Sequence, residues 1–84
     1  AMKVTVKYFA SIRESIGAGA ESVQTGALSV GMLRDELLAR GGAHADALAR
    51  GRAVRVALNQ VMSDDAAMLT EGCEVAFFPP VTGG

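Results

Sequence analysis

The chain has 84 residues, half of them apolar, and its eight Lys and Arg against nine Asp and Glu give a formal net charge of −1. This length predicts one small domain that buries about 60% of the surface of its unfolded chain. The near-neutral charge without a basic stripe excludes typical nucleic-acid binding, and no apolar run approaches the roughly 18 residues of a membrane span. We therefore expect a cytoplasmic protein, and the single cysteine, Cys73, fits a reducing compartment.

The N-terminal region is predicted to form a β-hairpin that carries a short helix between its strands. Residues 3–9 alternate apolar and polar side chains, and residues 21–25 are expected to form a second strand that pairs with them. Ser11 and Glu14 have the spacing of a capping box, which predicts a short helix over residues 11–16. The side chains of the first strand that should face the core are Val4, Val6 and Tyr8.

The main helix is predicted to begin after Ser29, whose hydroxyl is a typical N-cap. Gly41 and Gly42 are expected to end it as a C-terminal cap. The apolar stripe of this helix is formed by Val30, Leu33 and Leu37, helped by Leu38. The residues expected to point away from the core are Arg34, Asp35 and Glu36.

The second half of the chain is predicted to add further strands. Residues 44–50 are rich in alanine and predict a short helix or turn. Residues 52–58 alternate again and predict a third strand, which a turn at residues 59–60 ends. Residues 74–78 predict the last strand, because the prolines at 79–80 can neither donate to a ladder nor continue it.

A hairpin, one crossover helix and further strands together predict an α+β fold. A small mixed sheet packed on one main helix buries the stripe of the helix against the apolar face of the sheet, and the crossover should be right-handed. This is the β-grasp arrangement of ubiquitin-like domains. We expect a single domain over residues 1–79 and an extended, flexible C-terminal tail over residues 80–84, and we take Ala1, before Met2, as a remnant of expression.

Side chains that could carry catalysis are scarce. His44 is the only histidine, so a Ser-His-Asp triad or a His-rich metal site has little support, and we expect it to be exposed. Cys73 is predicted to be a partly buried apolar residue rather than a nucleophile, and the adjacent Asp64 and Asp65 to cap a turn; no metal site is expected. A basic cluster is either a solvated face or a contact for an acidic partner or a phosphate; it comprises Arg50, Arg52 and Arg55.

Two aromatic residues fall on the polar side of their strands. Lys3, Thr5 and Lys7 define the outward face of the first strand, and the same parity places Phe9 outward. In the last strand, parity places Phe78 outward as well. If the two strands are neighbours, these rings form one exposed apolar patch, which on a small domain marks a partner surface; the alternative is that a bulge or a strand end turns one ring into the core.

The C-terminus ends in Gly83 and Gly84, which at ~7% glycine usage occurs by chance in about one chain in two hundred. A side-chain-free end can thread a narrow channel and present the terminal carboxylate to the active site of another protein. Residues 79–80 stiffen its exit, and the four residues after them reach roughly 13 Å when extended. The alternative is an inert tail.

Residues 74–84 resemble the C-terminal signature of the small subunit of molybdopterin synthase, the sulfur carrier of molybdenum cofactor biosynthesis, through the ending Phe-Phe-Pro-Pro-Val-Thr-Gly-Gly. Cys73 stands where that family is expected to have an acidic residue. The resemblance spans essentially the whole chain, because further matching positions are Lys3 to Ala10, Arg13, Glu14, Asn59, Gln60, Leu69 and Gly72.

The resemblance implies a non-catalytic subunit that carries sulfur. An ATP-dependent activating enzyme adenylates the carboxylate of Gly84, and a sulfur donor then displaces AMP and leaves a thiocarboxylate. The loaded tail enters the large subunit of the synthase and gives its sulfur to cyclic pyranopterin monophosphate, in an assembly of two large and two small subunits. No cofactor is bound permanently, and ATP is used by the activating enzyme.

The resemblance also assigns positions to these roles. Gly84 bears the sulfur, and the residues that fit the channel of the partner are Val81, Thr82 and Gly83. The docking patch implied by the family is formed by Phe9, Met62 and Phe78, with Arg13 beside it. Phe9 and Phe78 are the two rings that strand parity already places outward.

Three other functions stay open at this point. The chain is also compatible with a sulfur carrier of another pathway, such as thiamine biosynthesis, because those carriers end in Gly-Gly too. A ubiquitin-like protein modifier would use the same adenylate to form isopeptide bonds. An interaction domain with an inert tail belongs to a different class altogether.

Overall fold

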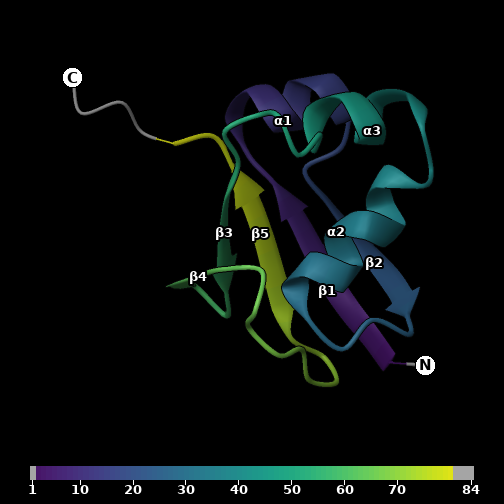
Figure 1. Ribbon diagram of the computed structural model, residues 1–84, viewed down its shortest axis with the longest axis vertical. Helices are drawn as coiled ribbons and strands as arrows, with labels where there is room; N and C mark the ends of the chain where they lie inside the picture. Colours follow the sequence, from purple (N-terminus) through teal and green to yellow (C-terminus); the bar gives the residue numbers. More distant parts are fainter. Residues whose placement is uncertain (1, 81–84) are drawn as a thin grey trace.

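The structure, a computed structural model, describes residues 2–80, which form a five-stranded mixed sheet with helices packed on it (Figure 1). None of the helices in this part of the chain is long and apolar enough to cross a membrane. The elements are β1 (Met2–Tyr8), α1 (Ala10–Ile16), β2 (Ala20–Thr25), α2 (Val30–Leu38), α3 (Gly42–Ala47), β3 (Arg55–Leu58), β4 (Val61–Ser63) and β5 (Glu74–Phe78).

The sheet has the strand order β2-β1-β5-β3-β4, so the first and last strands lie side by side in its middle. β1 pairs antiparallel with β2 and parallel with β5, and β3 pairs antiparallel with both β4 and β5. The helices cover one face, with α2 across β1 and β2 (Figure 1). The expected α+β, ubiquitin-like β-grasp fold is confirmed.

The core lies between α2 and the covered face of the sheet, as the sequence pattern predicts. On β1 the buried side chains are those of alternate residues, because successive side chains of a strand point to opposite faces. The apolar stripe of α2 is at most 1% exposed. The members of this core that the pattern predicted are Val4, Val6, Tyr8, Val30, Leu33 and Leu37.

The start of α1 differs from the prediction. The helix begins one residue earlier than expected, at Ala10, and Phe9 is its N-cap, with no side-chain cap. Ala10 has a φ of 52°, so the chain turns sharply there out of β1. Ser11 consequently lies inside the first turn and the capping box predicted with Glu14 is wrong. The helix ends as expected at Gly17, whose φ of 86° favours glycine.

The start of α2 is confirmed, and its end is not. The Ser29 hydroxyl accepts a hydrogen bond from the backbone N–H of Met32 at 3.3 Å. The helix ends at Leu38, however, and Gly41 and Gly42 start α3 instead of capping α2. Both glycines have positive φ, so they form the chain reversal between α2 and α3.

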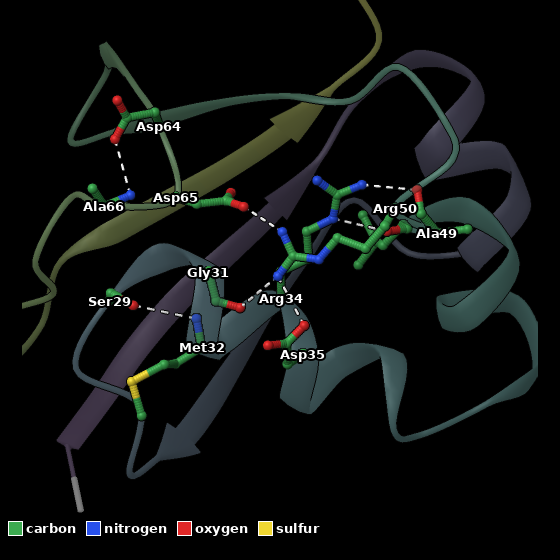
Figure 2. Close-up of polar contacts among 11 residues, drawn as sticks. Ser29, Gly31, Met32, Arg34, Asp35, Ala49, Arg50, Asp64, Asp65 and Ala66 are labelled. Atoms are coloured by element: carbon green, nitrogen blue, oxygen red, sulfur yellow. Dashed lines mark hydrogen bonds and ion pairs between the residues drawn. The ribbon is translucent and has the colours of Figure 1, made fainter.

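Arg34, predicted to point into solvent, is buried (Figure 2). Its Nε donates to the carbonyl of Leu48 at 2.8 Å and its Nη2 to that of Ala49 at 2.9 Å. These carbonyls follow the last turn of α3, where backbone acceptors have no partner within the helix. The guanidinium therefore joins α2 to the end of α3, and burial is tolerated because its donors are satisfied.

A second arginine, Arg50, ties three segments together on the surface. Its guanidinium donates to Asp35 at 2.8 Å and to the carbonyl of Gly31 at 3.0 Å, and pairs with Asp65 (Figure 2). A Cβ at position 31 would lie 3.2 Å from the backbone oxygen of Asp65, so the missing side chain lets the irregular segment after β4 approach α2. Arg50 thus belongs to the scaffold.

The β3–β4 hairpin is shorter than the pattern suggests. β3 begins at Arg55 rather than at residue 52, and Asn59 and Gln60 form its turn with φ of 51° and 69°. Positive φ at both central positions gives the turn the twist that a two-residue hairpin needs. The last strand, Glu74–Phe78, has the predicted bounds.

Glu21 of β2 binds three side chains from different elements. It accepts hydrogen bonds from the Tyr8 hydroxyl at 2.7 Å and from Arg40 at 2.8 Å, and its Oε2 lies 3.1 Å from Nε2 of His44. The ring of His44 meets Tyr8 edge-on, so the prediction that His44 is exposed is wrong. Burial raises the pKa of Glu21, but the hydrogen bonds from Arg40, Tyr8 and His44 outweigh it and hold that pKa at about 2.

Replacing Glu21 by Gln should lower the free energy of unfolding by about 1–2 kcal/mol at neutral pH, because three charge-assisted contacts are lost. The folded-state pKa of about 2 lies below the ordinary 4.5, so this contribution is complete above about pH 5 and disappears as the pH falls toward 2. Urea unfolding over that range measures it. The exposed Glu14→Gln variant is the control, and a deficit for Glu21→Gln that stays constant down to about pH 2.5 would contradict the assignment.

Candidate functional site

The face of the sheet opposite the helices carries a row of small and apolar side chains. Strand register places Lys7 beside Ala76, Ala76 beside Ala57, and Ala57 beside Met62. Residues directly paired across a sheet share a face, so this row crosses from β1 to β4. We call this the outer face; because its centre is alanine, it is flat.

Two aromatic rings and one methionine border this row. Phe9 is 46% exposed and Met62 is 61% exposed, whereas Phe78 is only partly exposed. The backbone N–H of Phe9 donates to the carbonyl of Phe77 at 3.2 Å, so Phe9 follows β1 directly beside the end of β5. The prediction that both rings lie away from the core is confirmed. Phe78 is less exposed than strand parity predicts.

Arg13 lies beside Phe9. It lies within α1, and its backbone N–H donates to the carbonyl of Phe9, the N-cap residue, at 3.3 Å. Its guanidinium passes over Gly19, where a Cβ would come within 3.2 Å of Nε. The structure therefore places Phe9, Arg13 and Phe78 around the ends of β1 and β5, while Met62 lies on the same face two strands away, on β4. We call Phe9, Arg13, Met62 and Phe78 the docking patch, after the role predicted for them.

Charged groups flank the docking patch. Lys7 and Glu74 form an ion pair of 3.2 Å at the β1–β5 junction. Arg55 is exposed and pairs in register with Phe78, so it lies on the same face. An apolar strip bordered by charges is the usual anatomy of a protein interface, with an apolar centre and a polar rim.

The C-terminal tail leaves from the same end of the sheet. β1 and β5 are parallel, so Phe9 and the exit of β5 lie at one edge, where Pro79 and Pro80 are partly buried. The predicted site residues Val81, Thr82, Gly83 and Gly84 lie outside the described residues. Extended, the four of them would reach roughly 13 Å from Pro80.

The remaining candidates from the sequence serve the scaffold. Cys73 is 3% exposed and belongs to the core, so it is apolar packing as predicted, but it is more deeply buried than the partly buried residue that was expected. Asp64 accepts from the N–H of Ala66 at 2.9 Å and so caps a turn, as expected. Of the basic cluster, Arg50 is held in ion pairs, while Arg52 and Arg55 are exposed. Within residues 2–80, no three His, Cys, Asp or Glu side chains converge to hold a metal.

Sequence reasoning missed the alanine row of the outer face. Ala57 and Ala76 are no more than 9% exposed although they point away from the helices. Part of this row could have been predicted from the sequence. The turn at residues 59–60 fixes the register of β3 with β4, and this register places Ala57 opposite Met62. That Ala76 lies next to Ala57 could not be read from any local pattern, because the two residues are 19 positions apart in the sequence (76 − 57).

Comparison with known proteins gives concordant matches. A model of the ThiS family matches residues 6–84. The molybdopterin synthase sulfur carrier subunit of Escherichia coli (strain K12) is 41% identical over 81 residues, which cover 96% of this chain and 99% of that protein. The matched region thus includes the outer-face residues and the Gly-Gly end.

Solved structures agree in fold. A complex of subunits 1 and 2 of molybdopterin-converting factor from Helicobacter pylori contains a chain that is similar with a TM-score of 0.70 and 25% identity, covering 99% of this chain and 100% of that one. The small archaeal modifier protein 1 of Haloferax volcanii is similar with a TM-score of 0.77 and 26% identity, covering 96% and 100%.

Stability measurements should separate the two kinds of patch residue. Met62→Thr keeps a good strand former at an exposed position and should leave the unfolding free energy within about 0.5 kcal/mol. Phe78→Ala removes a partly buried ring and should lower the melting temperature by roughly 4–8 °C, equivalent to about 1 kcal/mol. Equal melting temperatures for the two variants would show that the Phe78 ring does not pack in the free domain.

Proposed function

The chain belongs to the ThiS family, and we propose that it is the sulfur carrier subunit of a molybdopterin synthase. Identity of 41% over nearly the full length of a protein with that name supports the proposal. The observation that carries it is geometric: Phe9 and Phe78 of the docking patch lie beside the start of the Gly-Gly tail, at one end of the central strands. A partner that binds the patch is thereby positioned to receive the tail.

The functional group in this proposal is the carboxylate of Gly84. An oxygen of this carboxylate attacks the α-phosphorus of ATP on an activating enzyme, and pyrophosphate leaves. A sulfur nucleophile then attacks the acyl carbon, AMP leaves, and the terminus becomes a thiocarboxylate. Activation is needed because a carboxylate is a poor acceptor for nucleophiles, whereas its mixed anhydride with AMP carries a good leaving group.

The chemistry of sulfur transfer takes place on the large subunit. The tail brings its thiocarboxylate to cyclic pyranopterin monophosphate, and two transfers complete the dithiolene of molybdopterin. The proposed assembly holds two large and two small subunits. The carrier contributes binding and delivery, in agreement with the complex of subunits 1 and 2 known for a similar chain, and the large subunit supplies the acid, the base and the substrate site.

A protein modifier is the second candidate function. The similarity to a small archaeal modifier protein, with a TM-score of 0.77, favours it. Both functions start from the same adenylate and differ in the nucleophile, which is a sulfur donor in the carrier and a lysine amine of a target in the modifier. A carrier for thiamine biosynthesis differs from the proposed function only in the final acceptor.

Intact mass spectrometry separates these functions. The chain is incubated with activating enzyme, ATP and a sulfur source, and the carrier function predicts the mass gain of one oxygen replaced by sulfur at Gly84. Subsequent incubation with large subunit and cyclic pyranopterin monophosphate should return the mass to its starting value and produce molybdopterin. Isopeptide adducts without sulfur exchange would favour the modifier, and an unchanged mass would favour the inert tail.

Deleting Gly84 should abolish molybdopterin formation and leave the fold intact. The deletion removes the acceptor carboxylate from its proposed position in the channel, while the last described residue that belongs to the core is Phe77. Activity is read in the reconstituted synthase assay and the fold by thermal unfolding. A truncated chain that still supports synthesis at the parent rate would contradict the role of Gly84.

Cys73→Ala should keep full sulfur transfer. The thiol is 3% exposed inside the core, where it cannot meet a sulfur donor, so the variant should lose at most about 1–2 kcal/mol of stability from the small cavity. The measurement is the rate of thiocarboxylate formation at a temperature well below unfolding. A large loss of that rate with an unchanged melting temperature would mean that sulfur passes through Cys73.

A further inference from the structure

A pocket of about 250 Å³ opens where the tail begins. It lies between α1, α3, the segment before β3 and the exit of β5, at the end of the sheet where α1 and α3 stand (Figure 1). Its lining residues are Ser11, Ile12, Ser15, Ala47, Arg52, Ala53, Val54 and Pro79. None of these lining residues belongs to the docking patch.

The lining is apolar inside and polar at the mouth. Ile12 and Ala47 are each 4% exposed and line the pocket from the core side. The exposed polar members are Ser11, Ser15 and Arg52. An apolar interior with a positive charge at the rim suits an apolar side chain that is accompanied by a carboxylate.

Arg52 is available for such a contact, unlike its neighbour Arg50. Arg50 binds Asp35, Asp65 and the carbonyl of Gly31. Within residues 2–80 the Arg52 side chain makes no hydrogen bond or ion pair, although its backbone N–H donates to Ala49 at 2.9 Å. The backbone is therefore fixed, while the guanidinium charge has no partner among the described residues.

The position of the pocket connects it to the docking patch. Ser11 lies two residues after Phe9, and Pro79 follows Phe78 directly. The five residues 80–84 reach roughly 17 Å when extended, whereas a standard interface covers about 800 Å² per partner, which is roughly 30 Å across. A protein that holds the end of the tail in its active site closely surrounds the tail exit, and the pocket opens at this exit because Pro79 is part of its lining.

We propose that this pocket receives an apolar side chain and an adjacent carboxylate of the large subunit, and so extends the docking surface around the tail exit. The inference rests on the proposed function. A volume of about 250 Å³ is below the roughly 300–1,000 Å³ of small-molecule sites, which favours one or two protein side chains over a nucleotide. Arg52 pairs with the carboxylate, and Ile12 contacts the apolar side chain.

Calorimetric titration of the full chain into large subunit tests the proposal with two pocket variants. Arg52→Glu reverses the charge at the rim, and Ala53→Trp fills the pocket from an exposed loop position. Each should raise the dissociation constant at least about tenfold without lowering the melting temperature. Lys3→Glu makes the same charge change at the far end of β1 and should bind within about twofold of the parent.

Salt dependence identifies the charged contact. Parent affinity should fall as ionic strength rises, and Arg52→Gln should weaken this dependence, because one screened ion pair is absent. If the parent binds and both pocket variants bind within about twofold of it, the pocket proposal is overturned and the sulfur carrier function stands. If the parent itself does not bind large subunit, both proposals fail.

Discussion

Parallel pairing of β1 with β5 is the constraint on which the rest of the molecule depends. These strands come from opposite ends of the chain, and their register runs from Thr5 beside Glu74 to Tyr8 beside Phe77. Parallel neighbours end at the same edge of a sheet, so Phe9 and the exit of the tail are brought together by backbone hydrogen bonds. Moving Phe9 away from the end of β5 would require this central pair to separate, which would expose the core.

The same arrangement explains how a small domain can leave one face of its sheet uncovered. Large apolar side chains on the outer face would favour self-association, but Ala57 and Ala76 at its centre offer little apolar area. Met62 and the two aromatic rings stand at the margins of this row, beside Arg55 and the Lys7–Glu74 ion pair. The face is flat enough for a partner to cover and polar enough at its rim for the free domain to remain dispersed.

Local patterns predicted the strands and the core well and the polar interior badly. Alternation identified the inward side chains of β1, and the bounds of β5 follow from the prolines after it. The prediction for Arg34 was wrong because this residue borders the apolar stripe of Leu33 and Leu37 on the helix. Whether its side chain is buried depends on the carbonyl that accepts its hydrogen bond, which lies 14 residues later in the sequence. The prediction that Gly41 and Gly42 end α2 was wrong for a related reason, since two glycines can end one helix or begin the next.

The features of the candidate site also differ in whether a local sequence pattern determines them. Strand parity identifies Phe9 and Phe78 from sequence alone because it depends on local alternation. The alanine row and the pocket at the tail exit depend on which strands and helices become neighbours, and no local pattern contains that information. Arg52 and Arg50, two residues apart, show the limit clearly: only the fold reveals that one is engaged by Asp35 and Asp65 and the other is not.

The polar side chains of the described residues serve structural contacts, which agrees with a proposed cycle whose reactive group is the terminal carboxylate. Catalytic sites usually contain a side chain with a perturbed pKa and an open approach for substrate. Glu21 has the low pKa, but its three donors occupy it and join β2 to the helices. Every buried side-chain nitrogen and oxygen in residues 2–80 has a hydrogen-bond partner, so this part of the chain is built for holding its shape. The proposed cycle therefore places reactivity at the carboxylate of Gly84, and it assigns the acid, the base and the substrate site to the partner that receives this carboxylate.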